Sequence, residues 1–406
     1  MINIVLFVLV VGSPWFIIPW WPDWTRTPKE LFIMSGVFLM LISCMIRGKT
    51  RLAGLNLPLA LFMVWCVITV IKVGFSLMTV APMLFENGKM SDVVLPEMFY
   101  NSNILNIGLF AFLYCVIQKN VKNWAIIYPV IITATLLSIY GIIQVWYDPI
   151  TQIDRTNPWR VSGLFGNPND YIQHLAISIP FFLLIKRNIK WLFIILVLTA
   201  MVVSKFVLSG SFSFGSGLIA LPFGIAFYLY AVKSKWAKRY LYLLLVLTVG
   251  LYFFVTNDKY NAGTNDSFQS RMAFTEMTLK ELDRSPLSKW FGWGFGMYKQ
   301  HVGKVIGGYK GGVLYEAHNE YLQMFTELGY IGLILFGWIL IDLCRKIWLC
   351  RNNEIVMVFT TSLFIAAQIS VVNFPMHIAT TGFLIFVIYS AIYKEAVNGQ
   401  SVKICV

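Results

Sequence analysis

Residues Trp124 to Val145 read WAIIYPVIITATLLSIYGIIQV, an unbroken run without Asp, Glu, Lys or Arg. A helix rises about 1.5 Å per residue, so a run of this length can cross the hydrocarbon core of a bilayer, about 30 Å thick. The basic cluster Lys119-Asn-Val-Lys122 comes immediately before it. An apolar run of spanning length with lysines at one end predicts a transmembrane helix.

The rest of the chain repeats this pattern. Of 406 residues, 58% are hydrophobic and 13% charged, and the mean hydropathy is +0.70. Soluble domains carry about 25% charged residues, so a water-soluble globule is excluded. Lipid leaves open backbone without partners, and we therefore expect an all-α polytopic membrane protein whose single transmembrane domain covers residues 1–406. The expected spans are residues 3–20, 30–46, 57–79, 103–118, 124–145, 161–185, 191–210, 213–232, 240–256, 320–341, 354–373 and 377–393.

The basic residues give the orientation of these twelve spans. The net charge of +13 is spread over short clusters, each following an even-numbered span, so it does not indicate nucleic-acid binding. If that side is the cytoplasm, it holds 17 of the 32 lysines and arginines. The positive-inside rule therefore predicts a multi-pass protein of the bacterial inner membrane with both termini cytoplasmic.

One long loop, residues 258–320 between spans 9 and 10, is too polar to span and is expected on the periplasmic face. A helix starting near Asp266, with Leu279 and Leu282 on one face, is predicted to lie along the membrane surface and to end at Pro286. Gly292, Gly294 and Gly296 then indicate a flexible turn, because no strand precedes them as a nucleotide-binding loop requires.

Polar residues gather at two outer positions beside the bilayer. His318 stands at the mouth of span 10, and Glu316, Asn319 and Tyr321 surround it. The second position is the start of span 6, where Arg160, Asn167 and Asn169 lie close together, with Lys205 near the outer end of span 7. Such a concentration beside lipid predicts a cavity, although His174 in the same stretch is expected to be structural.

These residue types suit transfer from a phosphate donor. A guanidinium group binds phosphate oxygens in a bidentate way, and a histidine takes a proton from a hydroxyl. No Asp-x-Asp or His/Cys set with metal-ligand spacing lies in the outer loops, so we expect no metal and no cofactor. The expected reaction is group transfer from a lipid phosphate or diphosphate to a hydroxyl acceptor.

Two motifs carry a family resemblance. Residues Arg160 to Asn169 read RVSGLFGNPN, and residues His318 to Gly332 read HNEYLQMFTELGYIG. Together with Ser270-Arg271 and Asn373-Phe-Pro-Met-His377, they resemble the superfamily of O-antigen ligases and Wzy-type polymerases. The resemblance covers roughly residues 120–395 in order and spacing, and the segment that begins at His318 is its most specific part.

The resemblance implies an inverting, metal-independent glycosyltransferase whose donor is a glycan on undecaprenyl diphosphate. It implies that Arg160 and Arg271 bind the diphosphate and that His318 is the catalytic residue that receives or orients the acceptor hydroxyl. Asn167, Asn169, Lys205, Glu316, Asn319 and Tyr321 are expected to line the cavity. Ser213-Phe214-Gly215 departs from the family, since many members have an arginine there.

Several functions remain open at this point. A ligase would transfer a finished O-antigen to a sugar of lipid A-core, whereas a polymerase would use a second lipid-linked glycan as acceptor. The compact single loop favours the ligase slightly. A transporter of lipid-linked glycans would need ionisable pairs near the midplane of the membrane and a repeated half, and neither is evident.

Overall fold

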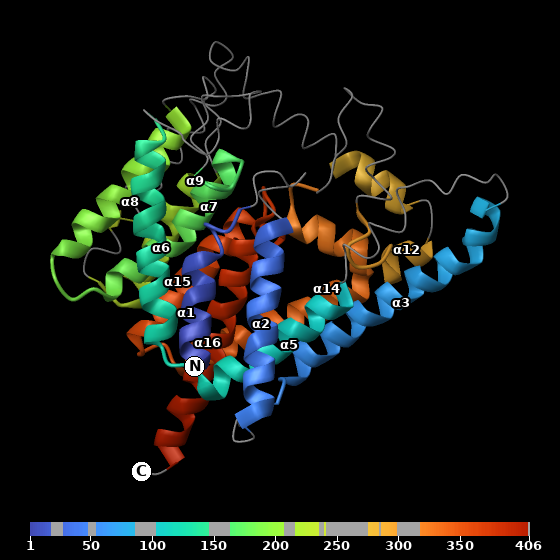
Figure 1. Cartoon of the computed structure of the whole chain (residues 1–406), viewed down its shortest axis with the longest axis horizontal. Helices are drawn as coiled ribbons and strands as arrows, with labels where there is room; N and C mark the ends of the chain where they lie inside the picture. Colours follow the sequence, from blue (N-terminus) through green and yellow to red (C-terminus); the bar gives the residue numbers. More distant parts are fainter. Residues whose placement is uncertain are drawn as a thin grey trace. The chain divides into compact units, whose positions relative to one another are not determined.

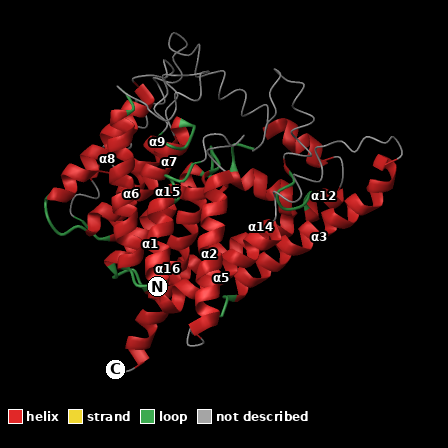
Figure 2. Cartoon of the chain, in the orientation of Figure 1, coloured by secondary structure: helices red, strands yellow, loops and turns green. Residues whose placement is uncertain are grey.

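The computed structural model contains only helices and the turns between them in the part of the chain that it describes (Figure 2). The expected all-α class is therefore confirmed for these residues. The described residues are 1–17, 27–47, 54–85, 103–145, 163–206, 216–234, 239–240, 275–283, 286–298 and 317–404.

Four of these helices are long and apolar enough to cross a membrane: α2 (Thr27–Arg47), α6 (Trp124–Ile143), α14 (Glu320–Leu349) and α16 (Ala379–Ile404). Shorter apolar helices lie at six more expected spans, so the chain is a multi-pass membrane protein. The number twelve stays a prediction, because span 240–256 lies almost wholly outside the described residues. The shorter apolar stretches are α1 (Ile2–Gly12), Leu57–Lys72 in α3 (Leu57–Phe85), Ile107–Asn120 in α5 (Asn103–Asn120), Ile189–Ser204 in α8 (Ile189–Phe206), Gly217–Ala231 in α9 (Ser216–Ala231) and α15 (Glu354–Ile369).

The sixth expected span begins later than the sequence indicated. Helix α7 runs from Pro168 to Ser178 and continues as the 3-10 helix η2 (Ile179–Leu184). Proline is favoured in the first turn of a helix because its missing N–H needs no partner there. The side chain of Asn167 caps α7 by accepting the backbone N–H of Asn169 at 2.9 Å. The residues expected as the first part of a span are therefore turns and a helix cap.

Two other expected spans have different ends. Helix α1 stops at Gly12 instead of continuing to residue 20. Helix α14 continues to Leu349, and it is interrupted at Gly329, where φ is 66° and ψ is −169°. A left-handed φ is costly for residues with a Cβ atom, so the glycine permits the kink.

The chain divides into two compact units. The first comprises residues Met1–Leu52, Val116–Gln269 and Arg345–Val406, and the second comprises Ala53–Cys115 and Ser270–Cys344. Within the first unit, α6 packs against α1 and α8, while α15 packs against α9 and α16 (Figure 1). The short helix α7 packs against α9 and α15, and nearly all its side chains are buried.

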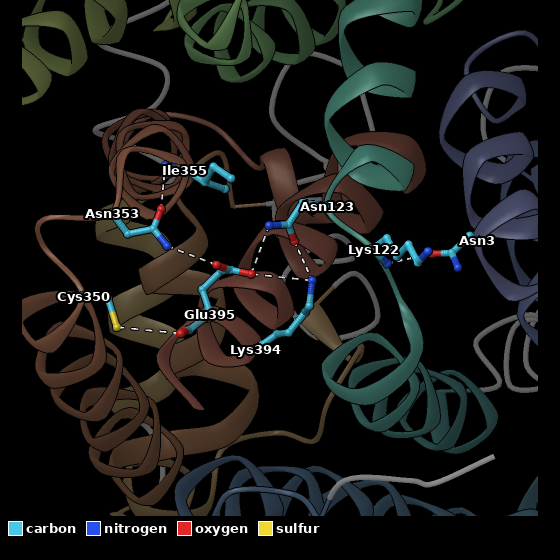
Figure 3. A network of polar contacts seen from close by, with 8 residues as sticks. All are labelled: Asn3, Lys122, Asn123, Cys350, Asn353, Ile355, Lys394 and Glu395. Atoms are coloured by element: carbon cyan, nitrogen blue, oxygen red, sulfur yellow. Dashed lines mark hydrogen bonds and ion pairs between the residues drawn. The ribbon is translucent and has the colours of Figure 1, made fainter. Parts of the chain in front are cut away.

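A polar network joins three helices of the first unit around Glu395 in α16 (Figure 3). Its carboxylate accepts the side-chain amides of Asn123 at 3.0 Å and Asn353 at 3.1 Å. Lys394 donates to the side-chain oxygen of Asn123 at 2.6 Å and lies 3.6 Å from the carboxylate of Glu395. Asn123 precedes α6 and Asn353 caps α15, so the network fixes the starts of both helices against α16.

The start of α1 reaches the same end of this unit. The side-chain oxygen of Asn3 accepts the backbone N–H of Lys122 at 2.7 Å (Figure 3). The starts of α6 and α15 therefore contact the later part of α16, and the start of α1 contacts the residues just before α6. The positive-inside rule predicts that these four segments share the cytoplasmic side.

Candidate active site

His318 lies directly before α14 in an unusual backbone conformation. Its φ is 51°, in the left-handed region, which costs about 1–2 kcal/mol for a residue with a Cβ atom. Asn319 then caps α14, because its side-chain oxygen accepts the backbone N–H of Leu322 at 3.0 Å. Strained residues of this kind persist only where their surroundings hold them, and they gather at functional sites.

A relay of two side chains in α14 holds the residue before His318. The side-chain oxygen of Gln323 accepts the backbone N–H of Ala317 at 3.1 Å. The amide nitrogen of Gln323 in turn donates to Glu327 Oε1 at 3.2 Å. The two residues are one helical turn apart and only 4% and 3% exposed. In such a buried position each hydrogen bond is protected from competing water.

Glu327 also binds the glycine turn, which is formed by residues 292–296, and Tyr298 just after it. Its Oε2 accepts the backbone N–H of Gly296 at 2.8 Å, and its Oε1 accepts that of Tyr298 at 3.3 Å. Gly292, Gly294 and Gly296 have φ values of 67°, 116° and 79°. The expected turn is confirmed at these three glycines, and its backbone contacts α14.

The same turn satisfies backbone groups freed by the kink in α14. The backbone N–H of Trp293 donates to Thr326 O at 2.8 Å, and that of Gly294 donates to Glu327 O at 2.9 Å. The indole N–H of Trp65 in α3 donates to Leu328 O at 3.0 Å. Carbonyl groups left unpaired inside a membrane protein are costly, so these contacts make the kink at Gly329 tolerable.

A small apolar core lies beside the relay. It consists of Leu282, Trp293, Tyr298 and Ala317, with Met277, Met297, Leu322 and Phe325 packed against it. The Tyr298 hydroxyl lies 3.0 Å from the Thr278 hydroxyl. The core and this contact hold residues 275–283, which are helical, against the residue that precedes His318.

The described part of the predicted surface helix covers residues 275–283, and its expected start near Asp266 lies outside the described residues. Leu282 is buried in the small apolar core, whereas Leu279 is 40% exposed. Its position along the membrane surface stays a prediction. Pro286 is the first residue of a new helix, α12 (Pro286–Phe291).

Two ion pairs lie on the exposed side of this segment. Lys280 pairs with Glu276 at 2.7 Å, and Lys289 in α12 pairs with Asp283 at 2.6 Å. The hydrogen bond from Lys280 lowers the pKa of the Glu276 carboxyl, and the one to Asp283 raises the pKa of the Lys289 ammonium. Pairs exposed to solvent contribute little to stability, so these ion pairs are not what holds the segment in place.

In the first unit, the turn before α7 is clamped from two helices. Gln144, which ends α6, accepts the backbone N–H of Gly163 at 2.9 Å and donates to its carbonyl at 3.3 Å. The buried ammonium of Lys29 in α2 donates to the carbonyl of Leu164 and lies 4.7 Å from the ring centre of Phe165. The turn that leads to Asn167 is therefore rigidly held.

His174 has the structural role that the sequence indicated. It is buried in α7, and its Nδ1 lies 3.2 Å from the Thr381 hydroxyl of α16. Its ring centre lies 5.2 Å from that of Phe165. These contacts tie α7 to α16 and to the clamped turn.

Six of the nine candidate residues lie in the described part of the chain, at three places. Asn167 and Asn169 lie together at the start of α7, and His318, Asn319 and Tyr321 lie together at the start of α14. Lys205 belongs to the last turn of α8. The remaining three, Arg160, Arg271 and Glu316, lie outside the described residues, so the predicted approach of Arg160 to His318 stays a prediction.

Sequence reasoning gave no role to Gln323 or Glu327. A usable signal existed, because two polar residues four positions apart share one face of a helix and rarely occur in an apolar span without a partner. The sequence could not show that their partners would be backbone groups of the glycine turn and of Ala317.

The fold is that of a helical membrane protein, and several of its candidate residues lie at the starts of α7 and α14. Residues 206–337, which are 132 of the 406, match a family model described as O-antigen ligase. This match confirms the resemblance seen in the motifs, and the family consists of membrane glycosyltransferase-like enzymes. The matched range contains Arg271, His318 and the relay, but it begins after Arg160. No curated protein matches the chain.

Proposed function

We propose that the protein is an O-antigen ligase of the bacterial inner membrane, with its active site on the periplasmic face. It moves a glycan from undecaprenyl diphosphate to a sugar hydroxyl of lipid A-core. The observation that carries the proposal is the strained backbone of His318. His318 lies between Ala317, whose N–H is bound by Gln323, and Asn319, which caps α14. All three residues lie within the range that matches the O-antigen ligase family model.

The proposed step is a single displacement with inversion. The acceptor oxygen attacks the anomeric carbon and forms the new glycosidic bond, while the bond from that carbon to the diphosphate oxygen breaks. The acceptor proton passes to His318, and undecaprenyl diphosphate leaves with the bonding electron pair. A histidine suits this role because its ordinary pKa lies near neutrality.

The leaving diphosphate gains negative charge in the transition state. We assign Arg160 and Arg271 to that charge, because guanidinium groups form bidentate, charge-assisted hydrogen bonds to phosphate oxygens. In this proposal the protein needs no metal and no cofactor. Asn167, Asn169, Lys205, Glu316, Asn319 and Tyr321 are proposed to contact the donor or the acceptor sugar.

The polymerase reaction uses the same donor, and only the acceptor differs. Ligase and polymerase are therefore separated by the products of purified protein in liposomes. The protein would be given an undecaprenyl-diphosphate-linked glycan together with either lipid A-core or a second portion of the lipid-linked glycan. We expect a single ligated product on lipid A-core. A ladder of lipid-linked glycans would identify a polymerase, and no glycan transfer to either acceptor would refute both.

The same assay tests whether glycan transfer requires a metal ion. We expect full transfer after treatment with EDTA, since the proposed charge stabilisation comes from arginines. Activity that disappears with EDTA and returns with added magnesium or manganese would contradict this part of the proposal.

A further inference from the structure

We propose that Gln323 and Glu327 are positioning residues that set the orientation of His318 and join it to the glycine turn, residues 292–296. This inference rests on the proposed role of His318. It adds two residues, neither of which the sequence motifs assigned to the reaction.

The first step of the argument is the path from Glu327 to His318. Glu327 fixes the amide group of Gln323, since the amide nitrogen donates to Glu327 Oε1 at 3.2 Å. The opposite side of that amide then accepts the N–H of Ala317 at 3.1 Å. An amide has one donor side and one acceptor side, so the carboxylate determines which side faces Ala317. The backbone that leads into His318 is thereby held in place.

The second step is that His318 needs such support. Its left-handed φ of 51° is disfavoured for a residue with a Cβ atom, so the chain would relax if its neighbours were free to move. On its following side, Asn319 is held as the cap of α14. On its preceding side, Ala317 is buried and bound to Gln323. The relay therefore supplies one of the two anchors.

The third step is that packing alone does not explain why polar side chains occupy positions 323 and 327. A buried carboxylate is costly unless hydrogen bonds compensate it, and an apolar side chain of similar size would fill the same space. Glu327 instead accepts three donors, from Gly296, Tyr298 and Gln323. A residue of this kind is expected where a fixed geometry matters, and here it fixes the glycine turn and the approach to His318 in one structure.

The test compares two substitutions in the same helix. Gln323→Met keeps the length of the side chain and removes both of its hydrogen bonds. Thr326→Val is the matched control, because it removes an equally buried hydrogen bond, from the Thr326 hydroxyl to the backbone carbonyl of Gln323 at 2.9 Å. It leaves the side-chain hydrogen bonds of the relay in place. Both variants would be assayed as full-length protein in liposomes, with donor binding measured separately from turnover.

We expect Gln323→Met to lower kcat about 10- to 100-fold, because small displacements of a catalytic group cost that much. The affinity for undecaprenyl-diphosphate-linked glycan should stay unchanged, and Thr326→Val should keep the wild-type kcat. A substitution that merely loosened the fold would lower kcat in both variants. Equal kcat values in the two variants would overturn the inference.

A second set of variants covers the case in which Gln323→Met does not fold. Gln323→Glu alone places two carboxylates face to face, and Glu327→Gln alone places two amides there. The exchange Gln323→Glu with Glu327→Gln restores one carboxylate beside one amide and keeps every contact of the relay except that from Tyr298. We expect the double variant to regain most of the kcat that either single variant loses, as coupled residues do. A double variant as impaired as the worse single variant would contradict the relay.

His318→Ala in the same assay separates the two levels of the account. If His318→Ala abolishes transfer while Gln323→Met retains the full kcat, the positioning inference is wrong and the proposed function stands. If His318→Ala transfers glycan at the wild-type rate, the role of His318 fails and the inference fails with it.

Discussion

A Cβ atom at Gly292 would lie 2.2 Å from the carbonyl oxygen of Glu327. The reverse approach is as close, since a Cβ atom at Gly329 would lie 2.3 Å from Trp290 O. Backbone thus meets backbone where the glycine turn crosses the kink of α14. The hydrogen bonds of Trp293 and Gly294 to α14 depend on this approach.

Gly292→Ala should therefore destabilise the protein by at least about 2 kcal/mol, because the added methyl group clashes with backbone and the φ of 67° disfavours alanine. Thermal unfolding in detergent measures this. Gly337→Ala in α14 is the control, since its Cβ atom would meet no atom of the described residues within 4 Å. We expect the control to be neutral or slightly stabilising, and equal losses in both variants would refute the close approach.

The strain at His318 gives a second prediction. His318→Gly and His318→Ala should both lower transfer about 10²–10⁴-fold. The glycine variant should be more stable by about 1 kcal/mol, because glycine accepts a φ of 51° freely. Thermal unfolding of the two variants side by side provides the comparison. An alanine variant as stable as the glycine variant would mean that the left-handed conformation is not maintained.

The network around Glu395 predicts a large effect on stability (Figure 3). Glu395→Ala leaves the amides of Asn123 and Asn353 without their acceptor, and we expect a loss of about 3 kcal/mol in the free energy of unfolding. Glu395→Gln, which keeps one acceptor oxygen, should lose less. Glu276→Ala removes an exposed ion pair and should cause no measurable change. A loss in Glu395→Ala no larger than that of Glu276→Ala would contradict the network.

Gln144 allows a comparison of two glutamines in the first unit. Gln144→Met removes both hydrogen bonds to Gly163 and should cost about 1–3 kcal/mol, since the backbone groups are left buried and unpaired. Gln368→Met in α15 is the matched control, because the buried side-chain oxygen of Gln368 has no hydrogen bond to any residue that the structure describes. Unfolding in detergent should show a loss for the first variant only. The reverse order would show that Gln144 does not clamp the turn.

The sequence predicted the helical membrane fold because apolar runs and basic clusters are visible directly in the order of the residues. The run from Trp124 to Val145 became α6, and His174 proved structural. The start of α7 at Pro168 and the kink at Gly329 were missed, because a helix start and a kink depend on a few dihedral angles that hydrophobicity does not encode. The relay of Gln323 and Glu327 was missed for a related reason: its partners are backbone N–H groups, which every residue except proline carries.

The donor-binding arginines can be separated from His318 by mutation. Arg160→Ala and Arg271→Ala should weaken both donor binding and turnover, since each removes a charged hydrogen-bonding partner worth about 1.5–3 kcal/mol. Arg→Lys at either position should restore only part of the donor binding and turnover, because an ammonium group cannot form the bidentate contact. Full activity in Arg160→Lys or Arg271→Lys would contradict the bidentate role.

The most direct measurement of the central claim is donor binding and glycan transfer by His318→Ala in the same liposomes. We expect undecaprenyl-diphosphate-linked glycan to bind with nearly wild-type affinity, while transfer to lipid A-core falls about 10²–10⁴-fold, as loss of a general base predicts. Loss of donor binding equal to that in Arg160→Ala and Arg271→Ala would contradict this, and would make His318 a ligand of the diphosphate instead of the base.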